Sequence, residues 1–271
     1  MEGHEQRAYR RGFALELPGR LFACHPTSYN TLRINGDGSL FDGLYKCEYR
    51  AGPVLNRSVM HVRGGRMLGG NSAFAHVGSY EEIDGEIVGR VAGQRHALIS
   101  EVRQLYGADD DELILRGRAV GDSYHFDASP VRLPDQVMHA VMTSLDEESL
   151  PPPGKVGNGG IPNGLYGLRI RALDGIEGGL TGVMLLEDGR MLGGDAFFYY
   201  LGSYSSADNR WRGEIVNQEH TAARDAIFGG YEVGIGFSGR WEGNGAVWEA
   251  TALAGKRSFQ LAAEMTLLHR I

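Results

Sequence analysis

One phrase occurs twice in this chain. It reads GRMLGGNSAFAHVGSY from Gly65 to Tyr80 and GRMLGGDAFFYYLGSY from Gly189 to Tyr204. Arg66 and Arg190 are therefore 124 residues apart, which is far longer than the period of a solenoid or propeller repeat. The two copies predict a duplicated domain.

Shorter matches flank the phrase and support the same duplication. They are Gly43-Leu44-Tyr45 with Gly164-Leu165-Tyr166, Gly85-Glu86-Ile87-Val88 with Gly213-Glu214-Ile215-Val216, and His96 with His220. Their offsets are 121, 128 and 124. Because the offsets differ by only a few residues, we expect the length differences to lie in surface loops between matched segments.

The chain length and a proline-rich stretch set the expected domain boundaries. A chain of 271 residues is long enough for two domains that each bury a core. The stretch DEESLPPPGKVGNGGIPN, residues 146–163, is typical of an exposed connection. We expect an N-terminal extension over residues 1–40, a first repeat over 41–145, this linker, and a second repeat over 164–271.

Apolar residues in each repeat follow a period of two, which predicts β-strands. Asp188-Gly189 and Gly64-Gly65 suit tight hairpin turns. The pattern gives seven strands per repeat and no long helix, with Gly69-Gly70 and Gly193-Gly194 bending one long strand in each copy. Since short antiparallel strands must hide their edges, we expect an all-β fold of two tandem antiparallel β-barrels.

Charge and cysteine content exclude several classes of function. A formal net charge of −7 argues against direct nucleic-acid binding. Cys24 and Cys47 give no disulfide framework, so we expect a reducing, cytoplasmic setting. The letters LFAC before residue 25 suggest a lipoprotein signal as an alternative, but Glu16 and Arg20 interrupt its apolar stretch. No run reaches the roughly 18 apolar residues of a membrane helix, and we expect no membrane partner.

The repeated motifs resemble those of a known bacterial family. Gly-Leu-Tyr at each repeat start, Gly-Arg-Met-Leu-Gly-Gly-Asp followed by aromatic residues, and Gly-Ser-Tyr are similar to the GrlR family of type III secretion regulators. The resemblance covers residues 41–271 apart from the linker and is stronger in the second repeat. It implies a lipocalin-like (calycin-like) barrel that forms a homodimer and represses by binding a transcriptional activator rather than DNA.

The resemblance also implies an acidic protein-binding loop after the long strand. In the first repeat this loop contains Glu81, Glu82, Asp84 and Glu86, and we expect it to bind a protein partner. The corresponding loop of the second repeat, residues 205–210, reads SSADNR and is not acidic.

Duplication suggests that the two repeats pair with each other within one chain, as an intramolecular pseudo-dimer. Phe197, Tyr199 and Leu201 align with the smaller Ala73, Ala75 and Val77. We therefore list as candidate sheet-face or pseudo-dimer contacts the aromatic residues of the two long strands, namely Phe74, His76, Phe197 and Tyr199. The alternative is that each face packs only against its own barrel interior.

Catalytic, metal and cofactor patterns are not recognisable, and we expect no enzyme activity, metal or cofactor. GFSGR, residues 236–240, has arginine where a nucleophile elbow needs glycine. His96 and His220 recur as a pair, which favours a structural role over that of a base. Asp109-Asp110-Asp111-Glu112 lacks the ligand spacing of a calcium loop. A regulator acting through protein binding is thus the first hypothesis, and a barrel that binds a small lipophilic ligand is the alternative.

Overall fold

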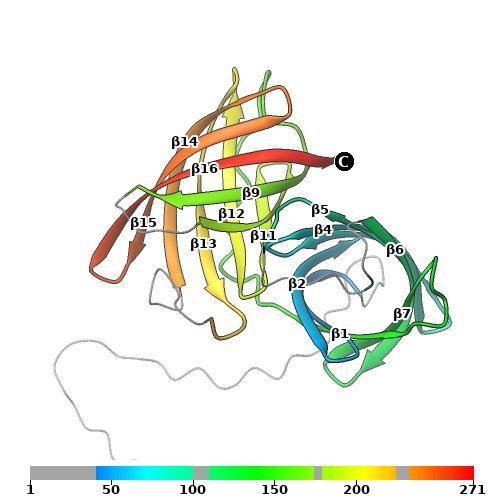
Figure 1. Ribbon diagram of the computed structural model, residues 1–271. Coiled ribbons are helices and arrows are strands. Elements are labelled where there is room, and N and C mark those ends of the chain that lie inside the picture. Colours follow the sequence, from blue (N-terminus) through cyan, green and yellow to red (C-terminus); the bar gives the residue numbers. More distant parts are fainter. Residues whose placement is uncertain (1–40, 100–105, 107–109, 174–178, 224–231) are drawn as a thin grey trace, which may run out of the picture. The chain divides into compact units, whose positions relative to one another are not determined.

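A computed structural model of the chain describes residues 41–99, 106, 110–173, 179–223 and 232–271 (Figure 1). All secondary structure in these ranges is β. The N-terminal extension over residues 1–40 and Cys24 lie outside the described residues. Within the described residues, no helix is long and apolar enough to cross a membrane.

The first half of the chain forms a closed antiparallel barrel, barrel 1. Its strands are β1 (Gly43–Ala51), β2 (Val54–Arg63), β3 (Arg66–Gly70), β4 (Phe74–Ile83), β5 (Glu86–Arg95), β6 (Asp110–Val120), β7 (Ser123–Pro130) and β8 (Met138–Ser144). Each strand pairs with its neighbour in sequence, and β1 pairs with β8 to close the barrel. Closure leaves no unpaired sheet edge.

The second half forms a closed barrel of the same kind, barrel 2. Its strands are β9 (Gly164–Ala172), β10 (Gly179–Glu187), β11 (Arg190–Gly194), β12 (Phe198–Ala207), β13 (Arg210–Glu219), β14 (Glu232–Glu242), β15 (Gly245–Ala254) and β16 (Arg257–Arg270). Here β16 pairs with β9 to close the sheet. The expected all-β fold of two tandem antiparallel barrels is confirmed.

Each barrel has eight strands and not the predicted seven, because the repeated phrase contains two strands. The predicted long strand ends at Gly70, and the chain reverses before β4 begins at Phe74. Asn71 Oδ1 accepts the backbone N–H groups of Ala73 and Phe74. Asp195 makes the same two bonds to Phe197 and Phe198. A side chain that satisfies the turn's backbone donors thus replaces the predicted glycine bend.

The offset between equivalent residues of the two repeats is more constant in the structure than the sequence matches predict. Tyr80 pairs with Gly89, and Tyr204 pairs with Gly213, so Gly89 and Gly213 are equivalent at an offset of 124. The match of residues 85–88 with 213–216 at an offset of 128 is therefore wrong. Gly85 lies instead in the β4–β5 turn with a φ of 79°, where glycine is favoured for a conformational reason.

Aromatic and sulfur-containing side chains fill the barrel interiors. In barrel 1, Phe41 lies at one end and packs against the rings of Tyr45, Tyr80, Tyr124 and Phe126. In barrel 2, Trp211, Phe237 and Trp248 form the central aromatic group. Each interior is thus a separate hydrophobic core.

A third apolar cluster contains residues from both barrels. It consists of Leu44, Val59, Leu68 and Ala75 from barrel 1 and Leu165, Val183, Leu185, Leu192, Tyr199 and Leu201 from barrel 2. Two polar contacts accompany it: Thr181 Oγ1 donates to the Ser72 carbonyl at 2.7 Å, and Arg66 pairs with Glu187 at 2.9 Å. The outer faces of the strands that carry the repeated phrase therefore pack against each other.

The segment predicted to be an exposed linker is partly built into barrel 2. The Gly154 N–H donates to the Gly189 carbonyl, and the Gly157 N–H donates to the Ser206 carbonyl. Ile161 is buried in the core of barrel 2. Ser206 also donates its N–H to the Lys155 carbonyl, so the segment covers the end of β12 that lies beyond its pairing with β11 and protects this sheet edge.

Candidate functional site

The acidic hairpin, which we define as residues 81–86, joins β4 and β5 at one end of barrel 1. Asp84 and Gly85 both have positive φ angles, 53° and 79°, as the tight β-hairpin turn requires. Glu81, Glu82 and Asp84 are exposed, and Glu86 is partly buried. The structure therefore brings all four predicted acidic residues to one hairpin.

Strand alternation divides these acidic side chains between two faces. Tyr80 is buried in the barrel core, so Glu82 shares its inward side and accepts the backbone N–H of Phe41 at 3.3 Å. Glu81 lies on the outer side, next to Ile83, whose side chain is 51% exposed. The outer face of the hairpin thus combines an acidic group with an exposed apolar side chain.

Neighbouring bases neutralise the hairpin only in part. Glu86 pairs with Arg116 on β6, and no ion pair to Glu81 or Asp84 is found among the described residues. Two carboxylates therefore remain available for a cationic partner. Solvent-exposed charges of this kind steer association more than they add affinity.

Two acids of the run at the start of β6 form ion pairs with arginines outside this strand. Asp111 pairs with Arg132 at 3.1 Å, and Glu112 pairs with Arg90 at 3.3 Å. Asp110 is the first residue of β6, while Asp109 lies outside the described residues. These contacts connect the start of β6 to β5 and to the turn after β7.

Of the candidate contact residues, one lies in the cluster between the barrels. Tyr199 is a member of it, where it occupies the position equivalent to Ala75. Phe197 lies just before β12 and is 37% exposed, and Phe74 packs under the guanidinium of Arg95 at 4.4 Å. His76 points into barrel 1, where its ring meets Tyr49. Phe74, His76 and Phe197 are thus not members of this cluster.

The interior of barrel 1 contains an apolar cavity of about 100 Å³. Among the residues that line it are Cys47, Met60, Leu115 and His76. The His76 Nε2 atom is buried and has no hydrogen-bond partner among the described residues. Burial, and then His96 nearby, lower the pKa of His76 to about 4. The ring is therefore neutral at physiological pH and offers one polar atom inside an apolar space.

Larger side chains stand at the equivalent positions of barrel 2. Leu115 pairs with Gly89, and Phe237 pairs with the equivalent Gly213. Phe126 pairs with Gly117, and Trp248 pairs with Gly239. These two glycines are equivalent, so Trp248 occupies the position of Phe126. The two barrels therefore differ in how completely their interiors are filled.

The recurrent histidines support the turns that follow β3 in barrel 1 and β11 in barrel 2. His96 Nε2 lies 3.0 Å from the Asn71 carbonyl, and His220 Nε2 lies 3.4 Å from the Asp195 carbonyl. Burial lowers the pKa of His96, and it lowers the pKa of His220 to about 4. A neutral ring in each barrel thus hydrogen bonds the backbone at the same place.

Asp195 is the buried acid of the repeated phrase. Its Oδ2 atom accepts the Tyr200 hydroxyl at 2.7 Å. Burial raises the pKa of this carboxyl despite the hydrogen bonds that favour its charged form. In barrel 1 the uncharged Asn71 replaces it, and its amide donates to Tyr49 and to the Arg57 carbonyl, each at 3.0 Å.

No protein-family model and no curated protein matches this chain. Two solved structures are similar to it. One is a proposed outer membrane protein from Bacteroides fragilis NCTC 9343, with 9% identity, a TM-score of 0.23, and coverage of 84% of this chain and 97% of that chain. The other is a double mutant of the vaccine antigen transferrin-binding protein B from Haemophilus parasuis Hp5, with 7% identity, a TM-score of 0.21, and coverage of 84% and 63%. Neither likeness bears on what this chain does.

Proposed function

We propose that this chain is a non-enzymatic regulatory protein of the GrlR type, which sequesters a transcriptional activator in the cytoplasm by protein–protein binding. The acidic hairpin is the observation on which this proposal rests. Glu81 and Asp84 project from barrel 1 without an ion pair to a described residue, beside the exposed Ile83. Such a surface is complementary to the basic, DNA-contacting face of an activator.

The hairpin would occupy basic side chains of the partner, and these side chains could then no longer contact DNA phosphates. Because those contacts supply much of the affinity for DNA, occupying a few of them is enough to weaken promoter binding. The acidic protein, with a net charge of −7, would also repel the DNA itself. Repression would then need no DNA contact by this chain.

The packing of the two barrels supports the resemblance to a homodimeric family. The third apolar cluster draws residues from both repeats, so one chain supplies the pairing that two single-domain copies would otherwise provide. A tether raises the effective concentration of one half for the other. We propose that the chain acts as an intramolecular pseudo-dimer with one acidic hairpin instead of two.

The test begins with native mass spectrometry of the protein purified from its own source, which identifies a retained protein partner. That partner is then titrated against the wild type and against a Glu81→Lys, Glu82→Lys, Asp84→Lys variant. We expect the variant to bind at least about tenfold more weakly. The matched control reverses three exposed acids elsewhere, Asp122→Lys, Asp135→Lys and Glu242→Lys, and should retain binding. An unchanged affinity in the hairpin variant would refute this site.

A second candidate function is binding of a small lipophilic molecule in barrel 1. The cavity of about 100 Å³ supports it, together with the unpartnered His76 Nε2 atom. An apolar cavity of roughly 150 Å³ stays dry and takes up benzene in another protein, so we expect this smaller cavity to accept only a small apolar molecule. One buried polar acceptor or donor would favour a ligand that combines an apolar body with a single hydrogen-bonding group.

Phenol and benzene are suitable probes for this cavity. We expect phenol to bind more tightly than benzene in a ligand-observed NMR titration, because only phenol can hydrogen bond His76. Leu115→Phe introduces the side chain found at the equivalent Phe237 and should abolish binding. Leu253→Phe, on an exposed position of barrel 2, serves as the control. Equal binding of phenol to both variants would rule out the cavity.

A further inference from the structure

A second charged surface lies on barrel 2 and has the opposite sign. A groove there is lined by Lys155, Arg210, Arg212 and Arg240, and its remaining lining residues are small, hydroxyl-bearing or aromatic. All four basic side chains are exposed. No aspartate or glutamate lines this groove, and none of the four bases forms an ion pair with a described residue. We call this surface the cationic groove.

Two of these arginines oppose each other directly. Arg210 on β13 pairs with Arg240 on β14 in the antiparallel register. Like charges at directly opposed positions destabilise a sheet. In barrel 1, the residue equivalent to Arg210 is Glu86, which pairs with Arg116 of the neighbouring strand. Barrel 2 thus has a repulsive pair where barrel 1 has an attractive one.

The chain also brings a third segment to this place. Lys155 belongs to the segment along β12, where its N–H donates to Ser205 Oγ at 3.0 Å and its carbonyl accepts the Ser206 N–H. Arg212 lies beside them, since it pairs with Ser205 on one side and Ser238 on the other. Four cations from three separate segments therefore line one groove, with small side chains between them.

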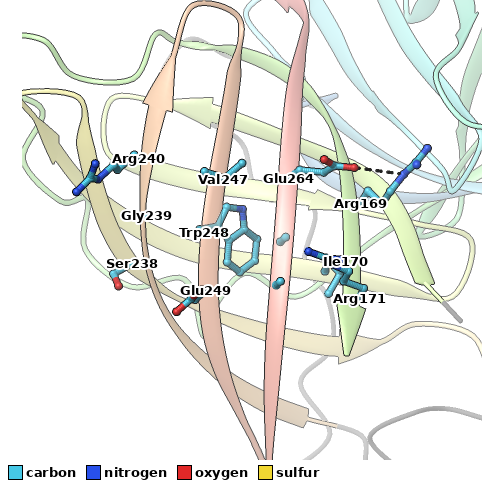
Figure 2. A pocket seen from close by; sticks show the side chains of 12 residues that line it. Arg169, Ile170, Arg171, Ser238, Gly239, Arg240, Val247, Trp248, Glu249 and Glu264 are labelled. Carbon is cyan, nitrogen blue, oxygen red and sulfur yellow. Dashed lines mark ion pairs between the residues drawn. The ribbon is translucent and has the colours of Figure 1, made fainter. Parts of the chain in front are cut away.

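The surface next to the groove is less uniform in charge. Arg240 also borders a second hollow, together with Arg169 and Arg171, but this hollow contains Glu249 and Glu264 (Figure 2). Glu264 pairs there with Arg169 at 3.8 Å. Of these two hollows, only the cationic groove has basic side chains and no acidic side chain in its lining.

We propose that the cationic groove binds an extended acidic segment of a partner protein. Arg210 and Arg212 stand on the same face of β13 two residues apart, about 7 Å along the strand, which is also the spacing of alternate side chains in an extended peptide. Carboxylates on alternate residues of such a segment would meet both guanidinium groups. Guanidinium groups bind carboxylates through paired hydrogen bonds. Arg240 and Lys155 would bind the flanking acids.

A protein segment fits this groove better than a nucleic acid does. Single strands of nucleic acid bind by stacking their bases on exposed aromatic rings, and the one ring that lines the groove, Trp211, is buried in the barrel core. A longer polyanion would also run into the acidic side chains of the neighbouring hollow. The groove therefore suits a short acidic stretch.

The experiment measures binding of a fluorescent hexaglutamate peptide to the full chain by anisotropy. We expect saturable binding that is lost at about 0.5 M salt, where exposed charges are screened, and no binding of hexaglutamine. Arg210→Glu with Arg240→Glu should weaken binding at least about tenfold. The control, Arg118→Glu with Lys256→Glu, changes the net charge equally and should retain it. Arg118 is the exposed strand arginine equivalent to Arg240.

Several outcomes would overturn the proposal. An equal loss in the control variant would show that only net charge matters. Tighter binding of a single-stranded RNA homopolymer than of hexaglutamate would assign the groove to nucleic acid instead. If the double variant failed to fold, Arg240→Gln provides the same comparison without a charge reversal. Glu81→Gln with Asp84→Asn, which adds no cation to the acidic hairpin, should bind hexaglutamate as the wild type does, so the two surfaces are tested independently.

Discussion

Gly194 of barrel 2 lies against Val59 of barrel 1, so that a β-carbon at Gly194 would stand 2.6 Å from Val59 Cγ2. The relationship is reciprocal, because a β-carbon at Gly70 would stand 3.0 Å from Val183 Cγ1. The second glycine of the Gly-Gly pair in each repeated phrase therefore allows the two barrels to approach each other. The same β-carbon would also clash with a backbone carbonyl of the following strand, Phe198 or Phe74 respectively.

Replacing either glycine should therefore destabilise the protein. For Gly194→Ala and Gly70→Ala we expect a loss of about 1–3 kcal/mol in the free energy of unfolding, as is usual for overpacking, measured by urea denaturation. Gly236→Ala is the control, because a β-carbon there meets nothing within 4 Å and its strand position is exposed. It should be neutral or slightly stabilising. A neutral Gly194→Ala would contradict the close approach.

Tyr199 should contribute more to stability than its neighbour Phe197. Tyr199 is 7% exposed within the cluster that joins the barrels, whereas Phe197 is 37% exposed. We expect Tyr199→Ala to cost about 3 kcal/mol and Phe197→Ala less than about 1 kcal/mol. Calorimetry of the Tyr199 variant should also show two transitions, since weaker contact lets the barrels unfold separately. A single sharp transition with an unchanged midpoint would argue against this role.

Exchanging the turn residues of the repeated phrase should have unequal effects. Asp195→Asn removes a buried charge while Oδ1 keeps its two backbone bonds, and we expect a gain of up to about 1 kcal/mol at neutral pH. Asn71→Asp places a carboxylate oxygen against the Arg57 carbonyl, which Asn71 now contacts as a donor at 3.0 Å. That change should cost about 2–3 kcal/mol. Denaturant midpoints of the two variants should therefore move in opposite directions, and equal shifts would be contrary to this account.

Acid should weaken the contact between the barrels through His61. This side chain is 7% exposed, and burial lowers its pKa from 6.5 to about 4 despite Glu187 nearby. Between these values the unfolded chain binds a proton that the folded chain does not, so stability falls as pH drops from 6.5 toward 4. His61→Leu, which copies the equivalent Leu185, should reduce that slope. Unfolding free energies at several pH values measure it, and an unchanged slope would exclude His61 as its source.

The sequence predicted the duplication and the barrels from local signals. Apolar alternation, turn glycines and the two copies of one phrase depend on neighbouring residues, and these are visible without coordinates. The extra strand was missed because the alternation continues through residues 66–80, while the reversal after Gly70 depends on bonds from Asn71 to the next backbone groups. An Asn or Asp side chain followed by one small residue, Ser72 or Ala196, was the available signal.

The candidate site was predictable only as a set of residues. The sequence placed Glu81, Glu82, Asp84 and Glu86 on one loop, and strand alternation then divided them between two faces. Sequence reasoning missed the cationic groove completely, because Lys155, Arg212 and Arg240 come from segments far apart along the chain. Only the register of β13 and β14 places Arg210 opposite Arg240.

By itself, therefore, the sequence determined that this chain folds as two copies of one β-structure, since backbone turns and strand periodicity are local properties. The tertiary structure decided which outer faces meet, which interior keeps a cavity and where opposite charges gather. These features depend on distances between residues that are remote in sequence, and such distances are set only when the barrels close and pack.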